Sequence, residues 1–298
     1  MIAVAGATGY IGGLLCARLR EQGRDLRALA RRPERSPELE RIGCEVRAAD
    51  VLDPATLGPA LEGVDVAYYL VHSMGRGSDG DFAARDHAGA ENFSAAAEKA
   101  GVRRIVYLGG LGEGSMHLDS RHATARTLQA GNVPLAYFRA AAVLGAGSES
   151  FRTVFHLVRR LPVMVTPKWV TTRTQPIAIE DVLAYLAAAV DLDAPLDREI
   201  QIGGADLTTY GGMIDELARA IGRRPPLRIT VPVLTPYLSS LWIGLVTPVD
   251  AGVARPLIEG LATETVVTDP SGMALFEVEA TSLARALDTA VVAMRASG

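Results

Sequence analysis

The stretch that decides the fold is Val4-Ala5-Gly6-Ala7-Thr8-Gly9-Tyr10-Ile11-Gly12. Its glycines have the spacing GxxGxxG, directly after a short apolar run and before an amphipathic stretch, as where a strand turns into a helix. Gly6 permits a tight turn, Gly9 lets the backbone approach a pyrophosphate, and Gly12 allows close packing of the helix. The helix N-terminus offers unpaired N–H groups to phosphate oxygens. The motif predicts dinucleotide binding; the plainer interpretation is a glycine-rich turn without a ligand.

Outward from this motif, the first half of the chain alternates short apolar runs with longer amphipathic stretches. This alternation is typical of βαβ units in a parallel sheet covered on both faces. Right-handed crossovers make such a sheet doubly wound, so the sequence predicts an α/β, Rossmann-type fold. Strands are expected at 2–5, 26–30, 45–49, 64–71, 104–108 and 135–138, and helices at 12–22, 92–100 and 124–130.

The regularity weakens after about residue 147. Helices are expected at 149–160, 180–190 and 211–221, and the proline-rich stretch 225–256 should form turns and short helices. We expect a nucleotide-binding core in residues 1–150, to which 176–203 return. A smaller substrate-side region would comprise 151–175 and 204–298.

Composition narrows the class of protein. The 298 residues are 49% hydrophobic and 21% charged, with a net charge of -4, which argues against nucleic acid as a partner. Cys16 and Cys44 are too few for a disulfide scaffold or a four-thiolate zinc site and suit a reducing cytosol. The five histidines have no metal-ligand spacing. No apolar run approaches the roughly 18–20 residues that span a bilayer, and no signal peptide is apparent. We expect a cytoplasmic monomer or homodimer with a small-molecule substrate and no metal.

The end of the second strand indicates which dinucleotide binds. An NAD site usually places Asp or Glu there to hold the ribose 2′-hydroxyl, whereas this chain has Arg31 and Arg32. An arginine fork suits a 2′-phosphate, so NADPH or NADP+ is preferred over NADH. Glu34 argues against this preference, and a solvated basic turn is the alternative.

These residues resemble the short-chain dehydrogenase/reductase superfamily in its extended and atypical branches, especially NmrA-like and complex-I-accessory-subunit-like proteins. Asp50-Val51 resembles the pair that binds adenine after the third strand, and Val71-His72-Ser73 stands where the fourth strand ends beside the cofactor. Later landmarks match at Arg139, Gly145, 175–182, 202–204 and 207–210. The resemblance implies that NADP(H) contacts Gly6, Thr8, Gly9, Tyr10, Ile11, Gly12, Asp50, Val51, Val71, His72, Ser73, Gly109, Gly110 and His122.

The chain departs from this superfamily where its reductases carry catalysis. Those enzymes use a Tyr-x-x-x-Lys pair, and a serine after the fifth strand polarises the carbonyl. Here the serine position is glycine, in Gly109-Gly110. Alignment on the following helix puts Leu118 at the tyrosine position and His122 at the lysine position, and the chain contains no Tyr-x-x-x-Lys. The usual proton relay is therefore not expected.

Several polar residues are candidates for a replacement relay. His122 can act as general acid or base, or can only hydrogen-bond the nicotinamide ribose. His72, at the carboxyl edge of the sheet, is a second proton donor or a polar rim residue. Ser73 and Ser120 are candidates for hydrogen bonds to substrate or cofactor. Arg121 would contact a phosphate or a substrate carboxylate, although a solvated helix arginine is the plainer interpretation.

Three further segments have both a functional and a structural interpretation. Residues 79–86 are a loop over the cofactor or a plain surface loop. Trp169 and Arg173 would wall a pocket and anchor an anion, or would be a core and a surface residue. The apolar run 237–246 would line a substrate cavity, form a dimer contact or be buried core.

Three functions are consistent with these features. The first is an NADPH-dependent oxidoreductase that transfers hydride to a small or medium apolar carbonyl, enone, imine or quinone, with His122 or water supplying the proton. The second is a non-enzymatic NADP(H)-binding sensor or assembly protein. The third keeps the cofactor but performs redox-neutral isomerisation or cyclisation.

Overall fold

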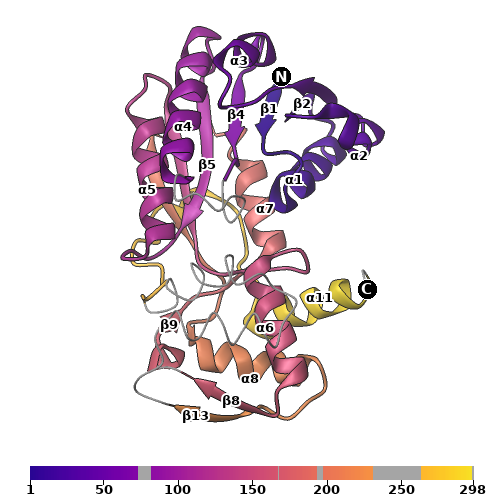
Figure 1. Ribbon diagram of the computed structural model, residues 1–298, viewed down its shortest axis with the longest axis vertical. Helices are drawn as coiled ribbons and strands as arrows, with labels where there is room; N and C mark the ends of the chain where they lie inside the picture. Colours follow the sequence, from indigo (N-terminus) through magenta and orange to yellow (C-terminus); the bar gives the residue numbers. More distant parts are fainter. Residues whose placement is uncertain (73–81, 167, 193–196, 231–262, 297–298) are drawn as a thin grey trace. The chain divides into compact units, whose positions relative to one another are not determined.

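A seven-stranded sheet organises the first part of the computed structural model, which describes residues 1–72, 82–166, 168–192, 197–230 and 263–296 (Figure 1). Its strand order is β11-β6-β5-β4-β1-β2-β3. β1 pairs in parallel with β2 and β4, β2 with β3, and β4 with β5. The predicted Rossmann-type α/β fold is thereby confirmed. The strands are β1 (Ile2–Ala5), β2 (Leu26–Ala30), β3 (Glu45–Ala48), β4 (Val66–Tyr69), β5 (Arg104–Gly110), β6 (Leu135–Ala140) and β11 (Arg198–Ile202).

The order of the strands locates the ligand-binding edge of the sheet. From β1 the chain runs outward through β2 to β3 and then returns to β4 on the other side of β1. In open α/β sheets, ligands bind at the carboxyl ends of the strands, where the strand order reverses. In this chain that point lies between β1 and β4.

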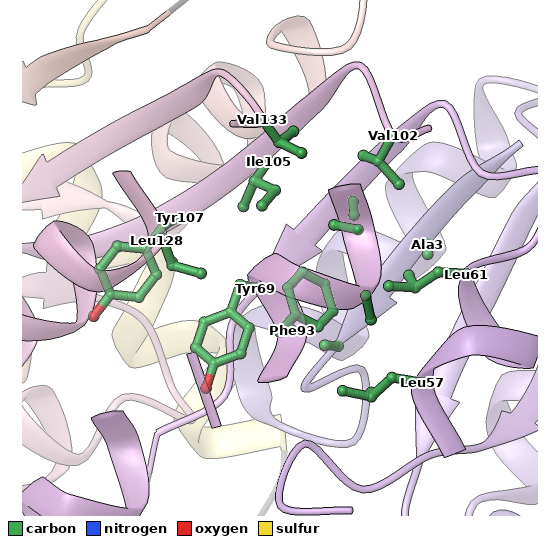
Figure 2. Packing of buried hydrophobic residues seen from close by; sticks show 14 of the residues in the cluster. Ala3, Leu57, Leu61, Tyr69, Phe93, Val102, Ile105, Tyr107, Leu128 and Val133 are labelled. Atoms are coloured by element: carbon green, nitrogen blue, oxygen red, sulfur yellow. The ribbon is translucent and has the colours of Figure 1, made fainter. Parts of the chain in front are cut away.

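One face of the sheet is covered by three helices, α3 (Pro54–Leu61), α4 (Phe82–Lys99) and α5 (Met116–Gln129). Figure 2 shows their side chains meeting those of the strands in one apolar cluster. Leu57 and Leu61 come from α3, Phe93 from α4, and Leu128 from α5. Burying each such side chain contributes about 1.5–3 kcal/mol, so this layer is a main source of stability.

The opposite face carries α7 (Ile179–Ala188), which follows a long excursion of the chain. Tyr68 alternates with Tyr69 along β4 and therefore points away from the α4 side. Its hydroxyl donates a hydrogen bond of 2.6 Å to the Leu186 carbonyl oxygen of α7. The helix α1 (Tyr10–Glu21) buries Leu15 and Leu19 completely.

Two helices begin earlier than their apolar patterns predicted. α4 begins at Phe82, ten residues before the expected start, and α5 begins at Met116, eight residues early. Near their starts both helices bury a polar side chain, Asp86 in α4 and Ser120 in α5, which interrupts the apolar periodicity. The expectation of a loop over 79–86 is wrong for residues 82–86, which are helical, and 79–81 lie outside the described residues.

The chain divides into two compact units. The first comprises Met1–Gly109, Ser120–Phe138 and Leu183–Ile200, and the second comprises Gly110–Asp119, Arg139–Val182 and Gln201–Gly298. The predicted boundaries at 150, 176 and 203 stay a prediction about domain organisation.

The second unit has its own apolar core around α6 (Glu149–Arg160), α8 (Tyr210–Ala220) and α11 (Leu283–Ala296). The helix expected at 149–160 is confirmed, and the one expected at 211–221 is shifted by one residue. Its short strands pair as β7 (Val143–Leu144) with β10 (Ile177–Ala178), β9 (Arg173–Thr174) with β12 (Thr208–Thr209), and β8 (Val163–Thr166) with β13 (Leu227–Thr230). The remaining elements are η1 (Pro33–Arg35), α2 (Pro37–Arg41), η2 (Lys168–Thr171) and η3 (Met273–Leu275).

The run 237–246 lies outside the described residues. Among the helices that are described, none is long and apolar enough to cross a membrane.

Candidate functional site

The glycine turn between β1 and α1 is closed so tightly that side chains would not fit. Gly6 has a positive φ of 86°, and a Cβ atom there would lie 2.6 Å from the Leu70 carbonyl oxygen. A Cβ atom at Gly12 would lie 2.2 Å from the Gly6 carbonyl oxygen. Both glycines are therefore required by the turn itself.

Gly9 and the start of α1 have the properties of an anion site. Gly9 is the N-cap residue in an extended conformation, and its N–H donates to the Gly6 carbonyl oxygen at 3.0 Å. It carries no side chain to cap the helix, and the first turn of α1 contains no acidic residue. Thr8 and Gly9 are exposed, and Tyr10 and Ile11 are half-buried. This arrangement fits a pyrophosphate bound at the helix N-terminus.

The ends of β2 and β3 lie at the same edge of the sheet. Arg31 and Arg32 directly follow β2 and are exposed, as is Glu34. Because β2 pairs in parallel with β1, the two arginines and the glycine turn stand at neighbouring carboxyl ends. This is the placement that recognition of a ribose 2′-phosphate requires.

The corner after β3 is held by hydrogen bonds. Asp50 accepts from the Leu52 N–H through Oδ1 at 3.0 Å, and the Asp50 N–H donates to Thr56 Oγ1 at 3.0 Å. Asn92 of α4 donates to the Val51 carbonyl oxygen at 2.9 Å. Sequence reasoning missed Asn92, since an asparagine inside a helix carries no recognisable signal.

Beyond β4, His72 belongs to a buried polar cluster. Its Nδ1 lies 3.6 Å from Asp86 Oδ2, and Ser120 donates to the same oxygen at 3.4 Å. Burial and then the positive charge of Arg121 lower the pKa of His72, while Asp86 opposes the shift. The imidazole is thus held toward its neutral form. Val71 packs against the apolar cluster of Figure 2, and Ser73 lies outside the described residues.

His122 lies against Tyr137, which sequence reasoning did not single out. Its Nδ1 is 2.8 Å from the Tyr137 hydroxyl oxygen, and the two rings meet edge to face at 77°. Tyr137 stacks on Tyr107 of β5 with ring centroids 5.4 Å apart. In the sequence, Tyr137 is an ordinary buried strand residue. Only its alternation with Leu135 places it on the face covered by α5.

The two glycines at the end of β5 are each crowded by a side chain. A Cβ atom at Gly109 would lie 2.7 Å from Cε2 and 2.8 Å from the hydroxyl oxygen of Tyr137. One at Gly110 would lie 2.6 Å from Leu118 Cδ2. Leu118 is buried, so the aligned tyrosine position carries a packing residue. Arg121 donates to the Leu108 carbonyl oxygen at 3.4 Å.

The remaining candidates are not brought together with these residues by any described contact. Arg173 is exposed in β9, and its Nη1 lies 3.9 Å from Glu264 Oε2. The Trp169 side chain lies outside the described residues. Within the described ranges, no three His, Cys, Asp or Glu side chains form a group that would hold a metal ion.

Comparison with known proteins agrees with this geometry. Residues 6–148 match the NAD(P)H-binding family. The (4-alkanoyl-5-oxo-2,5-dihydrofuran-3-yl)methyl phosphate reductase of Streptomyces griseus is 38% identical over 108 residues, 36% of this chain and 34% of that protein. The ceramide reductase of Caulobacter vibrioides is 27% identical over 192 residues, 63% of this chain and 60% of that protein. The matches therefore span about a third and three fifths of these relatives.

Solved structures show the same fold along nearly the whole chain. The triphenylmethane reductase of Citrobacter sp. complexed with NADP(H) superposes with a TM-score of 0.76, covering 98% of this chain and 100% of that one at 19% identity. Residues 6–148 thus carry the match to the NAD(P)H-binding family, and the chain shares the fold of this solved structure along nearly its whole length.

Proposed function

We propose that this protein is an NADPH-dependent reductase of the atypical branch, acting on a small or medium apolar carbonyl, enone, imine or quinone. The observation that carries the proposal is the tight glycine turn before α1, a helix whose N-terminus has no side-chain cap, with Arg31 and Arg32 at the neighbouring strand end. The reductase names of the two curated relatives support the reaction type.

We expect each part of the cofactor to be bound by a different group of these residues. The amides of 6–12 would hold the pyrophosphate, and Arg31 and Arg32 the 2′-phosphate. Asp50 and Val51 would border the adenine. The nicotinamide end would lie near Val71, His72, Ser73, Gly109, Gly110 and His122. When bound, NADPH supplies a hydride from its nicotinamide ring.

The two histidines take different roles in this proposal. His72 is held toward its neutral form by burial and by Arg121, so it is suited to hydrogen bonding rather than to delivering a proton. His122 is half-buried, and one of its ring nitrogens is fixed by Tyr137. We therefore assign to His122 the proton that the reduced oxygen or nitrogen receives.

The first test is calorimetric titration of the protein with NADPH and NADH. Arg31→Ala should weaken NADPH binding by about tenfold or more, because a charge-assisted contact contributes about 1.5–3 kcal/mol. Its affinity for NADH should stay unchanged. Arg41→Ala is the matched control, since Arg41 is an exposed arginine in nearby α2. Equal affinity for both nucleotides, unaffected by Arg31→Ala, would contradict the NADPH assignment.

A second measurement separates the reductase from the other two functions. NADPH oxidation is followed with a panel of ketones, enones, imines and quinones. A sensor or assembly protein would bind NADPH without oxidising it. Its affinities for NADPH and NADP+ would differ, and a partner protein would change them. Product formation without net NADPH consumption would favour an isomerase or cyclase.

A further inference from the structure

We propose that Tyr137 is the positioning residue that holds His122 for proton transfer, and that residue 109 is glycine because the Tyr137 ring occupies the space of its side chain. The catalytic part of this inference rests on the proposed reductase function. The structural part is that Tyr137 orients His122 and excludes a side chain at residue 109, and it does not depend on that function.

The hydrogen bond between the two side chains fixes the orientation of the imidazole. The 2.8 Å separation joins Nδ1 of His122 to the phenol oxygen of Tyr137. Because the two ring nitrogens lie on opposite sides of an imidazole, Nε2 faces away from the phenol. The partner of one ring nitrogen also decides which nitrogen carries the proton.

Tyr137 can impose this orientation because its own ring is held in place. It stacks on Tyr107, with an angle of 23° between the rings. Tyr107 lies 6.1 Å from Tyr69, which lies 5.0 Å from Phe93, so aromatic rings continue across β6, β5 and β4 to α4. Figure 2 shows Tyr69 and Tyr107 within the apolar cluster. Rotation of the Tyr137 ring would disturb this packed row.

Two neighbouring strands also hold successive residues of α5. The Tyr107 hydroxyl donates to the Arg121 carbonyl oxygen at 3.3 Å, and Tyr137 binds the side chain of the next residue, His122. The backbone and the imidazole are thus fixed together at this point of the helix. That is the support from surrounding residues that a proton donor of defined geometry requires.

Gly109 completes the arrangement. A Cβ atom at this position would lie 2.7 Å from the ring of Tyr137, closer than side chains approach one another. Any residue with a side chain would push the phenol away from His122. The phenol oxygen itself lies 2.8 Å from that Cβ position, where a serine would otherwise place its side chain.

The proton can be followed from atom to atom. In the proposed step, the protonated form of His122 would donate its Nδ1–H to the phenol oxygen of Tyr137 and present its Nε2–H to the substrate. The Nε2 proton would then pass to the substrate atom whose double bond to carbon is reduced, and bound NADPH would supply the hydride that forms the new C–H bond and would be left as NADP+. His122 is left neutral, with its remaining proton on Nδ1 beside Tyr137, and water restores the proton on Nε2.

The first experiment observes the pair directly. The protein is labelled with ¹⁵N in its histidine rings, and the His122 signals are identified by their loss in His122→Asn. Tyr137→Phe keeps the ring but removes the hydroxyl, so the Nδ1 signal should shift. Gly109→Ala should produce the same shift. Tyr68→Phe is the control: it also removes a buried phenol hydroxyl, but one on the opposite face of the sheet.

The second experiment measures the consequence for catalysis, with NADPH and the probe 9,10-phenanthrenequinone. Tyr137→Phe and Gly109→Ala should lower kcat by about 10–100-fold, the usual effect of misplacing a catalytic group, and change KM for the quinone less than twofold. In Tyr137→Phe, NADPH affinity by calorimetry should stay within twofold. Tyr68→Phe should keep the wild-type kcat.

The outcomes separate the two levels of the inference. If the Nδ1 signal is the same in the wild type, Tyr137→Phe and Gly109→Ala, the positioning role is wrong. If the signal shifts but kcat does not, Tyr137 orients His122 without serving catalysis, and the catalytic part is overturned. If the wild type oxidises no NADPH with any acceptor, the reductase function fails together with that part. The NMR comparison still decides the structural part.

Discussion

At the scale of single residues, two adjacent glycines of α1 should respond to alanine in opposite directions. A Cβ atom at Gly12 would lie 2.2 Å from the Gly6 carbonyl oxygen, whereas one at Gly13 would lie 3.4 Å from the Ala7 carbonyl oxygen, which is ordinary contact. We expect Gly12→Ala to lower the free energy of unfolding by roughly 1–3 kcal/mol and to abolish NADPH binding. Gly13→Ala should raise the free energy of unfolding by about 0.5–1 kcal/mol. Urea unfolding of both variants checks this, and equal effects would contradict the geometry of the turn.

The buried imidazole of His72 predicts a dependence of stability on pH. Burial and Arg121 lower the pKa of His72 in the folded protein, with Asp86 opposing, so below about pH 6.5 the unfolded chain binds a proton that the folded protein resists. The free energy of unfolding must therefore fall as pH decreases through that value. We expect His72→Asn to lose less stability than the wild type between pH 7 and pH 5 in urea unfolding. The exposed His87 gives the control His87→Asn, which should retain the wild-type slope.

At the scale of elements, the sequence predicted the strands better than the helices around the site. The fully buried strands β1 and β4 are apolar throughout, and β2 is apolar except for Arg27, so their runs are visible. The N-terminal parts of α4 and α5 were missed because Asp86, Ser120 and His122 face polar partners there. The same polar side chains form the candidate site, so apolar periodicity predicts secondary structure least well at the site. The alignment found His122, but it had no means of finding Tyr137.

The contact between α4 and the end of α5 supports a prediction about a pair of residues. A Cβ atom at Gly131 would lie 2.1 Å from Ser94 Oγ, which is buried and has no hydrogen-bond partner among the described residues. We expect Gly131→Ala to cost roughly 1–3 kcal/mol of unfolding free energy in the wild type. In Ser94→Ala, where the nearest side-chain atom would be 3.5 Å away, the same change should cost little. A double-mutant cycle in urea measures this coupling, and additive effects would show that the clash is relieved elsewhere.

At the scale of the whole molecule, the second unit shows why its structure was harder to predict. Its polar contacts join residues far apart in the sequence. Thr174 and Thr265 share a hydrogen bond of 2.8 Å across 91 residues, and Thr281 donates to Asp181 at 2.7 Å across 100 residues. Such pairs leave no periodic signal, because each partner alone is an ordinary polar residue. The Rossmann-type unit repeats strand and helix locally, so its pattern is visible before any long-range contact is known.

The division into two units also predicts where cofactor binding should stabilise the protein. The glycine turn, Arg31, Asp50, His72 and His122 all belong to the first unit. A ligand that binds only the folded state raises the free energy of unfolding by about 2.7 kcal/mol when its concentration is a hundred times its Kd. The increase applies to each part of the protein that must unfold to release the ligand. NADPH should therefore slow amide hydrogen exchange in 1–72, 82–109, 120–138 and 183–192 more than in 139–166 and 201–230. Gly12→Ala should abolish the effect in both units. Equal protection of the two units by NADPH would mean that they unfold as one cooperative body, and the compact division would then carry no thermodynamic meaning.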